Sequence, residues 1–304
     1  MAAAASPETI KGEFAFWGPP GSGKDWMLRS FAKALEQYND QKSRRYDSRF
    51  EHRLTYGDGR PVSTEPPPKG TIVATQQGTA YDDRFRYTRT GRSAPLTKEQ
   101  RLSSHSHDIL VTNAAGGDTV ELDRSFVVTA SLEKAQCVLM LLDHTLIGQT
   151  GAVDRATYHE WVRNFLDYLE PLPAGQNRFI AACLTKVDRL SIIRDPEESV
   201  RLTFGPGMSQ LFAGYAGRGT VVRAFGVSAF GYLRSENRQA NLDGESIYLR
   251  DPNRWRPYNV EQPFFWLFEQ LERSRLATFT KPLGRMFFLS ERRQHYVSYP
   301  EGQL

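Results

Sequence analysis

A glycine-rich segment near the start of the chain constrains its fold more than any other feature. It consists of Gly18, Pro19, Pro20, Gly21, Ser22, Gly23 and Lys24. An apolar run at 13–17, expected to be a strand, precedes the segment, and a helical pattern follows it. Glycines allow such a loop to turn its backbone N–H groups inward, the next helix N-terminus adds positive potential, and the lysine reaches terminal phosphates. The segment therefore predicts a loop that binds a nucleoside triphosphate.

The residue after the lysine departs from the usual form of this loop. A serine or threonine normally stands there and coordinates Mg²⁺ through its hydroxyl, whereas this chain has Asp25. A carboxylate could hold the metal more strongly, or could repel the β-phosphate when no metal is bound. Either altered metal dependence or weakened hydrolysis is therefore expected.

Short apolar runs alternate with helical patterns along most of the chain. This alternation predicts an α/β fold, a three-layer sandwich with a mainly parallel sheet of about six strands. The helix after the loop places Leu28, Phe31, Leu35 and Tyr38 on one face, and the final helix is expected to start after Asn259 as N-cap. Further strands are expected at 71–75, 84–90, 108–113, 135–142, 178–184 and 221–227, with 84–90 and 108–113 antiparallel.

One domain, residues 12–275, is expected between a flexible N-terminus at 1–11 and a tail at 276–304. Charged or turn-rich stretches at 41–70, 91–107 and 231–257 are interpreted as loop insertions. His105 and His107 fall in the second of these, and no third metal ligand lies near them in sequence.

Composition excludes several classes of protein. No stretch approaches the roughly 20 apolar residues that span a bilayer, and the N-terminus lacks the pattern of a signal peptide. The 39 basic and 35 acidic residues leave a net charge of +4, which is too small and too evenly mixed to indicate nucleic-acid binding. Cys137 and Cys183 lie in apolar runs and read as inert core thiols. A soluble protein of the cytoplasm is expected.

A second motif, Thr185-Lys186-Val187-Asp188, directly follows an apolar run. With the phosphate loop, it resembles the P-loop GTPases of the translation-factor and Ras-like (TRAFAC) class, whose guanine motif reads Asn/Thr-Lys-x-Asp. The resemblance implies that Asp188 accepts hydrogen bonds from guanine N1–H and the 2-amino group, and that the Lys186 stem packs on the purine. Adenine lacks this pair of donors and would leave the carboxylate unpaired. An alternative without function is an N-cap Asp188 beside a solvated Lys186.

The same resemblance assigns roles to three more segments. Ser228 and Ala229 match the motif whose backbone N–H contacts guanine O6. The stretch 113–116 matches the Asp-x-x-Gly motif, with Asn113 in place of the aspartate of the metal shell. Gly116 would then contact the γ-phosphate. The alternative is a plain glycine-rich turn. Gly117 stands where many GTPases carry a water-orienting glutamine. The threonine expected to close over Mg²⁺ is Thr75 or Thr79.

The resemblance implies a slow GTPase that binds GTP, GDP and Mg²⁺ and acts as a switch with protein partners or a second copy of itself. Catalysis would rest on Lys24, Mg²⁺ and the loop amides, with Gly116 at the γ-phosphate. The stretch 256–267 is similar to atypical bacterial GTPases of multi-component or conflict-associated systems, including double-GTPase systems.

Two alternatives remain open on the sequence. Asp25, Asn113 and Gly117 would also suit a non-catalytic pseudo-GTPase scaffold. An AAA-type ATPase would use Asp143 as its Walker B carboxylate, with His144 in place of the usual glutamate and Thr185 as a sensor. The distance in sequence from Lys24 to Asp143 and the expected antiparallel pair of strands weigh against the ATPase.

Overall fold

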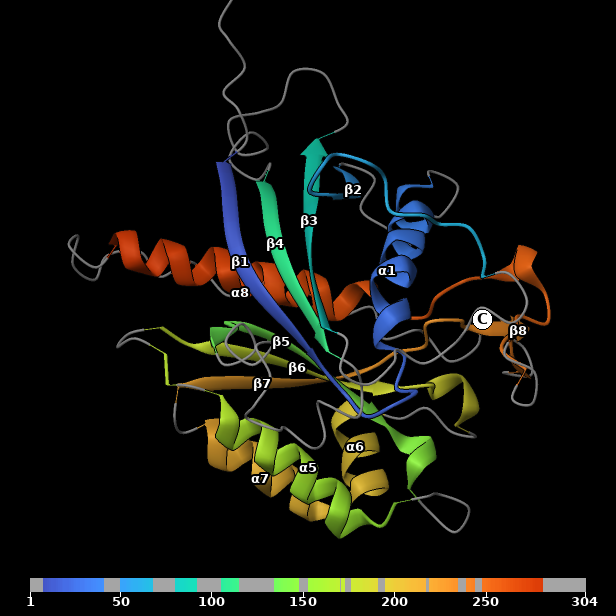
Figure 1. The fold of residues 1–304 in the computed structure, drawn as a ribbon, viewed down its shortest axis with the longest axis vertical. Coiled ribbons are helices and arrows are strands. Elements are labelled where there is room, and N and C mark those ends of the chain that lie inside the picture. Colours follow the sequence, from blue (N-terminus) through green and yellow to red (C-terminus); the bar gives the residue numbers. More distant parts are fainter. Residues whose placement is uncertain are drawn as a thin grey trace, which may run out of the picture.

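A computed structural model describes residues 8–40, 50–67, 80–91, 105–114, 134–147, 153–169, 171–172, 176–190, 195–216, 219–234, 239–243 and 248–280. Within these residues, one seven-stranded sheet organises the chain (Figure 1). Its strands are β1 (Glu8–Trp17), β2 (Phe50–Tyr56), β3 (Ala80–Gly91), β4 (His105–Ala114), β5 (Cys137–Asp143), β6 (Arg178–Thr185) and β7 (Thr220–Gly226).

The strands lie in the order β2-β3-β4-β1-β5-β6-β7. Strand β3 pairs antiparallel with both of its neighbours, and every other neighbouring pair is parallel. The predicted mainly parallel sheet with one antiparallel strand is therefore confirmed, with one strand more than expected.

Helices cover both faces of the sheet (Figure 1). On one face lie α1 (Lys24–Asn39) and α8 (Glu261–Thr280), whose apolar side chains join one buried cluster. On the other lie α5 (Arg155–Tyr168), α6 (Pro196–Phe204) and α7 (Pro206–Ala216), which pack into a second cluster. The chain thus forms the expected three-layer α/β/α sandwich, with the glycine-rich loop between β1 and α1.

Strands β5 and β6 are apolar along most of their length because both of their faces are covered. In β5, alternate residues such as Leu139 and Met140 belong to opposite clusters, and every residue of the strand is buried. This is the expected composition of a parallel strand between two helical layers.

The structure corrects several expectations about the polar segments. Residues 50–56, expected in a loop, form strand β2, and His105 and His107 lie in strand β4. Within 231–257, β8 (Tyr232–Arg234) and β9 (Gln239–Ala240) form a hairpin, so that 221–227 does not contain the last strand. Helix α8 begins at Glu261, and Asn259 takes a left-handed conformation with φ 54° instead of capping it. The strand expected at 71–75 lies outside the described residues.

Strand β2 is held at the edge of the sheet by its own chain. The side-chain amide of Asn39, at the end of α1, donates to the carbonyl of His52 and accepts from its N–H. Further along the strand, the N–H of Val62 donates to the carbonyl of Leu54. Such contacts occupy the backbone groups that an edge strand would otherwise offer to another chain.

His107 is buried because β4 passes under helix α8. Its Nε2 lies 3.0 Å from the Glu272 carboxylate, and its ring lies 4.6 Å from that of Phe268. A buried polar ring needs such a partner, and the partner here comes from the far end of the chain.

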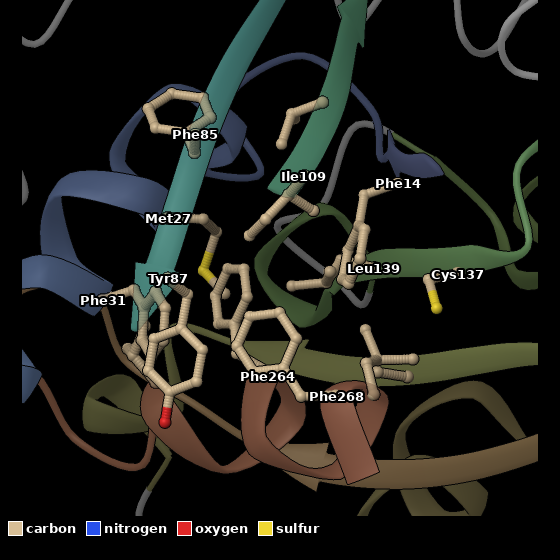
Figure 2. Packing of buried hydrophobic residues seen from close by; sticks show 14 of the residues in the cluster. Phe14, Met27, Phe31, Phe85, Tyr87, Ile109, Cys137, Leu139, Phe264 and Phe268 are labelled. Atoms are coloured by element: carbon tan, nitrogen blue, oxygen red, sulfur yellow. The ribbon is translucent and has the colours of Figure 1, made fainter. Parts of the chain in front are cut away.

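Aromatic rings join α1 and α8 to the sheet (Figure 2). The rings of Phe31 and Phe264 are stacked with centroids 4.1 Å apart, and those of Tyr87 and Phe268 are 4.5 Å apart. Phe31 and Phe264 have no exposed surface.

We expect the Phe264→Ala variant to lose about 3–5 kcal/mol of unfolding free energy, because it leaves a cavity between α1 and α8. Urea denaturation monitored by circular dichroism measures this loss. Arg273→Ala, an exposed position in the same helix, is the control and should change stability by less than about 0.5 kcal/mol. Equal effects of the two substitutions would contradict the packing described.

Candidate functional site

Four candidate segments follow neighbouring strands at one edge of the sheet. The glycine-rich loop follows β1, Asn113 lies at the end of β4, Lys186 follows β6, and Ser228 lies two residues beyond β7. Because β4, β1, β5, β6 and β7 are parallel, their carboxyl ends meet at the same edge. Ligands of open α/β sheets bind in this position.

The conformation of the glycine-rich loop explains its glycines. Gly21 and Gly23 have φ of 74° and 97°, and a Cβ at either position would meet open space. Their requirement is therefore conformational. A Cβ on Gly18 would instead lie 2.5 Å from Ser22 Oγ, so that this position needs glycine for close packing.

Lys24 folds back over this loop. Its Nζ donates to the carbonyl of Gly18 and, at 3.3 Å, to that of Pro19, and only 6% of the residue is exposed. Ser22 is 2% exposed, and its Oγ has no hydrogen-bond partner among the described residues. The loop thus holds a buried ammonium and an unsatisfied hydroxyl beside the first turn of α1, whose N–H groups lack helical partners.

The predicted metal residues are only partly described. Asp25 lies in the first turn of α1. The backbone of Asn113 is in register with Phe16 of β1, which brings the end of β4 beside the start of the loop. Thr75, Thr79, Gly116 and Gly117 lie outside the described residues. Among those that are described, no three His, Cys, Asp or Glu side chains form a cluster that could hold a metal ion.

Lys186 lies in a tight turn between β6 and the short helix η2 (Val187–Arg189). It has φ 59° and ψ 33°, a left-handed conformation that is uncommon for residues other than glycine. Its Nζ donates to Asp143 Oδ2 at 2.6 Å, and its carbonyl lies 2.9 Å from His144 Nε2. Lys186 is therefore ion-paired, with a side chain that is 25% exposed. Lys186, not Asp188, precedes the short helix, so the alternative interpretation is wrong about the N-cap.

Asp143 has no exposed surface, and both of its oxygens are occupied. Oδ1 accepts from the N–H and the hydroxyl of Thr145 at 3.0 and 2.7 Å, and Oδ2 accepts from Lys186. A Walker B carboxylate must turn toward a metal and the phosphates, so these contacts argue against the ATPase interpretation. Thr185 would be the sensor in that interpretation, and its hydroxyl donates to the carbonyl of Leu142.

Asp188 is 6% exposed. Burial raises the pKa of its carboxyl group, and the side chain of Ser228 offsets part of this rise. The Ser228 hydroxyl itself accepts from the N–H of Gly231 at 2.8 Å. The site thus presents a buried carboxylate whose desolvation is only partly compensated, which is a suitable acceptor for a paired donor on a ligand.

Ala229 is anchored from two directions. Its carbonyl accepts from Ser30 Oγ of α1 at 3.0 Å and from the indole N–H of Trp255 at 2.9 Å. Sequence reasoning found Ser228 and Ala229 as a motif but missed Ser30, Trp255 and the Asp143–Lys186 pair. Only Asp143 carried a visible signal, as an acidic residue at the end of an apolar run.

Comparisons with known proteins identify distant likenesses. No protein-family model matches the chain, and a search of curated proteins finds no match. Among solved structures, the chain is similar to the signal recognition particle receptor SRb-GTP/SRX complex from Chaetomium thermophilum, at 15% identity over 76% of this chain and 96% of that chain, with a TM-score of 0.44. It is also similar to the Arl6 BBS3 small GTPase from Trypanosoma brucei with bound GppNp, at 13% identity over 87% and 99%, with a TM-score of 0.42. No helix among the described residues is long and apolar enough to cross a membrane.

We expect Asp188→Asn to be more stable than the parent protein at pH 7, by about 1 kcal/mol, because the parent must bury a charged carboxylate there. A group whose pKa is raised by folding favours the folded state most at low pH, so this difference should vanish as the pH falls below the ordinary aspartate pKa of 3.8. Thermal unfolding between pH 7 and pH 3.5 measures it.

The control is Asp154→Asn. Hydrogen bonds from Thr157 lower the pKa of the exposed Asp154, so its contribution has the opposite sign and is lost in acid. If Asp188→Asn destabilised the protein at pH 7, the description of Asp188 as a carboxylate buried at a cost would be wrong.

Proposed function

We propose that this protein binds GTP and GDP with Mg²⁺ and acts as a slow, nucleotide-dependent switch. The observation that carries the proposal is the buried Asp188 carboxylate at the same edge of the sheet as the glycine-rich loop with Lys24. A phosphate-binding loop alone would fit many nucleotides. An acceptor that is desolvated and held in place favours guanine, which offers two adjacent donors.

In this proposal the loop holds the phosphates and the segments after β6 and β7 hold the base. Lys24 exchanges the carbonyls of its own loop for the terminal phosphates. The Lys186 stem packs on the purine, Thr185 stabilises the turn, and the N–H of Ala229 contacts O6 of the guanine. Gly116 contacts the γ-phosphate, and hydrolysis proceeds slowly because Gly117 cannot orient water.

The residues near the loop suit Mg²⁺ by their chemistry. Asp25, Asn113 and a hydroxyl from Thr75 or Thr79 would supply oxygen ligands, which magnesium prefers. The buried Ser22 Oγ of the glycine-rich loop, which has no hydrogen-bond partner among the described residues, is a further oxygen. The bound metal would neutralise charge on the phosphates, and Asp25 would replace the carboxylate that Asn113 lacks.

The proposal includes membership of the Ras-like and translation-factor class of GTPases, among its atypical bacterial members. It also includes a protein partner or a second copy that completes the catalytic site. Cytoplasm is the proposed compartment, and the two cysteines are buried free thiols, as a reducing compartment would leave them. The second candidate function is a scaffold that binds nucleotide without hydrolysis, which the aspartate at position 25 favours.

Titration with fluorescent GTP and ATP analogues tests the nucleotide. We expect GTP to bind more tightly than ATP in Mg²⁺, and Asp188→Ala to weaken GTP binding by about 100-fold or more, because the donors of guanine lose their partner. Lys24→Ala should weaken both nucleotides. The control is Asp58→Ala, an exposed carboxylate in the turn after β2. A preference for ATP, or no binding of either nucleotide, would refute the proposal.

Asp25 and Asn113 both differ from the residues usual in GTPase motifs, and exchanging them tests whether the two positions share one bound metal. We expect the double variant Asp25→Ser, Asn113→Asp to bind GTP in Mg²⁺ at least as tightly as the parent, because the charge around the metal is kept. Each single variant should shift the Mg²⁺ concentration needed for binding. Loss of binding in the double variant, with both single variants intact, would show that the two positions do not share a metal.

A further inference from the structure

The loop after β7 lies against a second stretch of backbone, at residues 256–258. Ser228 and Tyr258 exchange two backbone hydrogen bonds, in which the N–H of each donates to the carbonyl of the other, at 3.0 and 2.8 Å. A Cβ on Gly231 would lie 1.7 Å from the carbonyl oxygen of Arg256, so the two stretches are in direct contact there as well. Both ends of the loop are therefore fixed by backbone contacts.

Between these ends, the carbonyl of Ala229 accepts two hydrogen bonds from side chains. Ser30 Oγ, in helix α1, donates at 3.0 Å, and Trp255 Nε1 donates at 2.9 Å. Ser30 has no exposed surface, and Trp255 is 2% exposed. Because a carbonyl oxygen has two lone pairs, these two donors use its full capacity and fix its direction.

Fixing a carbonyl also fixes the N–H on the other side of the same peptide bond. In a trans peptide the C=O and N–H bonds point in opposite directions, so the N–H of Phe230 points away from α1 and Trp255. Tyr258 holds the Ser228 carbonyl, and the N–H of Ala229 points away from Tyr258 in the same way. Among the described residues, no group accepts a hydrogen bond from either N–H. The loop thus presents two adjacent donors whose directions are set by the partners of the carbonyls.

Trp255 is held in place by more than its indole N–H. It follows the short helix η3 (Pro252–Arg254), and its own carbonyl accepts from Gln37 Nε2, near the end of α1, at 3.2 Å. Its ring lies 6.3 Å from that of Trp26, in the first turn of α1. Replacing the indole by a phenyl ring therefore removes the donor while the backbone contact with α1 remains.

We propose that Ser30 and Trp255 are positioning residues for base recognition, which hold the peptide between Ala229 and Phe230 in the orientation that binds the ligand. Without either donor this peptide can rotate, and its N–H must be ordered again when the ligand binds, which weakens binding. The hydrogen bonds that Lys24 makes in the glycine-rich loop involve neither side chain, so the phosphates bind as before. This inference rests on the proposed function in one respect, the identity of the acceptor, which is O6 of guanine.

The first arm of the test needs no nucleotide. Carbon-13 labelling of alanine carbonyls with nitrogen-15 labelling of phenylalanine selects the three Ala–Phe peptides of the chain, at 15–16, 224–225 and 229–230. We expect the carbonyl signal of Ala229 to move upfield in Ser30→Ala and in Trp255→Phe, because each variant loses one donor, and to move further in the double variant. The other two peptides lie in strands β1 and β7 and serve as internal references. An unmoved Ala229 signal in both variants would overturn the proposal, whether or not the protein binds GTP.

The second arm measures dissociation constants for GTP, for 2-aminopurine riboside triphosphate, which lacks O6, and for inorganic tripolyphosphate. We expect Ser30→Ala and Trp255→Phe each to weaken GTP binding by about fivefold, the effect of one hydrogen bond between neutral groups, and the double variant to weaken it further. Binding of the analogue and of tripolyphosphate should stay at the parent values, because neither ligand carries the acceptor.

The ligands separate a positioning role from a structural one. Equal losses for GTP, the analogue and tripolyphosphate would show that the two residues only stabilise the fold, and would overturn the proposal. Unchanged GTP binding in the double variant would overturn it too. If the parent preferred ATP, the proposed nucleotide would be wrong. The positioning role would then be upheld if the variants weakened ATP binding and spared tripolyphosphate, and overturned if they did not.

Ser199→Ala and Trp266→Phe are the matched controls, because they make the same two changes at buried positions of α6 and α8. They should leave the Ala229 signal and all three dissociation constants at the parent values. Ser30→Ala places the best helix former inside α1, so this variant is expected to stay folded. It tests one donor even where Trp255→Phe loosens the segment around η3.

Discussion

The buried ion pair between Asp143 and Lys186 is the interaction on which the geometry of the site depends. An unpaired carboxylate in this position would cost several kcal/mol, so the fold must bring a cation to it. The cation is the ammonium group of Lys186, which directly follows the neighbouring strand β6. Lys186 contacts Asp143 while its backbone is in a left-handed conformation. His144 holds the carbonyl of that residue and so supports the unusual conformation. The turn that follows then places Asp188 under the loop after β7.

The elements that sequence reasoning predicted well are those whose signal is local. The glycine-rich loop and the doubly covered strands β5 and β6 are visible as a motif and as unbroken apolar runs. Strand β2 was missed because it is an edge strand, in which exposed Arg53 stands between buried His52 and Leu54. His107 was misplaced for a related reason, because its burial depends on Glu272, which lies 165 residues away in sequence.

In the candidate site, the sequence predicted the candidate binding residues better than it predicted the contacts that hold them in place. Lys186 and Asp188 were identified by their spacing after a strand, but the pairing of Lys186 with Asp143 is set by the register of neighbouring strands. Asn241 lay in a segment interpreted as a polar loop. Its polarity reflects hydrogen bonds to its own backbone and not contact with water. Composition alone cannot separate these two origins of a polar sequence.

In the proposed function, the contacts of α1 limit where a nucleotide-dependent change can occur. Ser30 and Trp26 join this helix to Ala229 and to Trp255, so that the glycine-rich loop and the loop after β7 are linked through packed side chains. Packed elements of this kind move as units, since interiors are as dense as crystals. The β5-β6-β7 half of the site is therefore suited to hold a ligand in one geometry. The carboxyl end of β4, where Asn113 lies beside the loop, is on the other side of β1. In the proposed function, a difference between nucleoside diphosphate and triphosphate is read at that end, because the base side is the same in both.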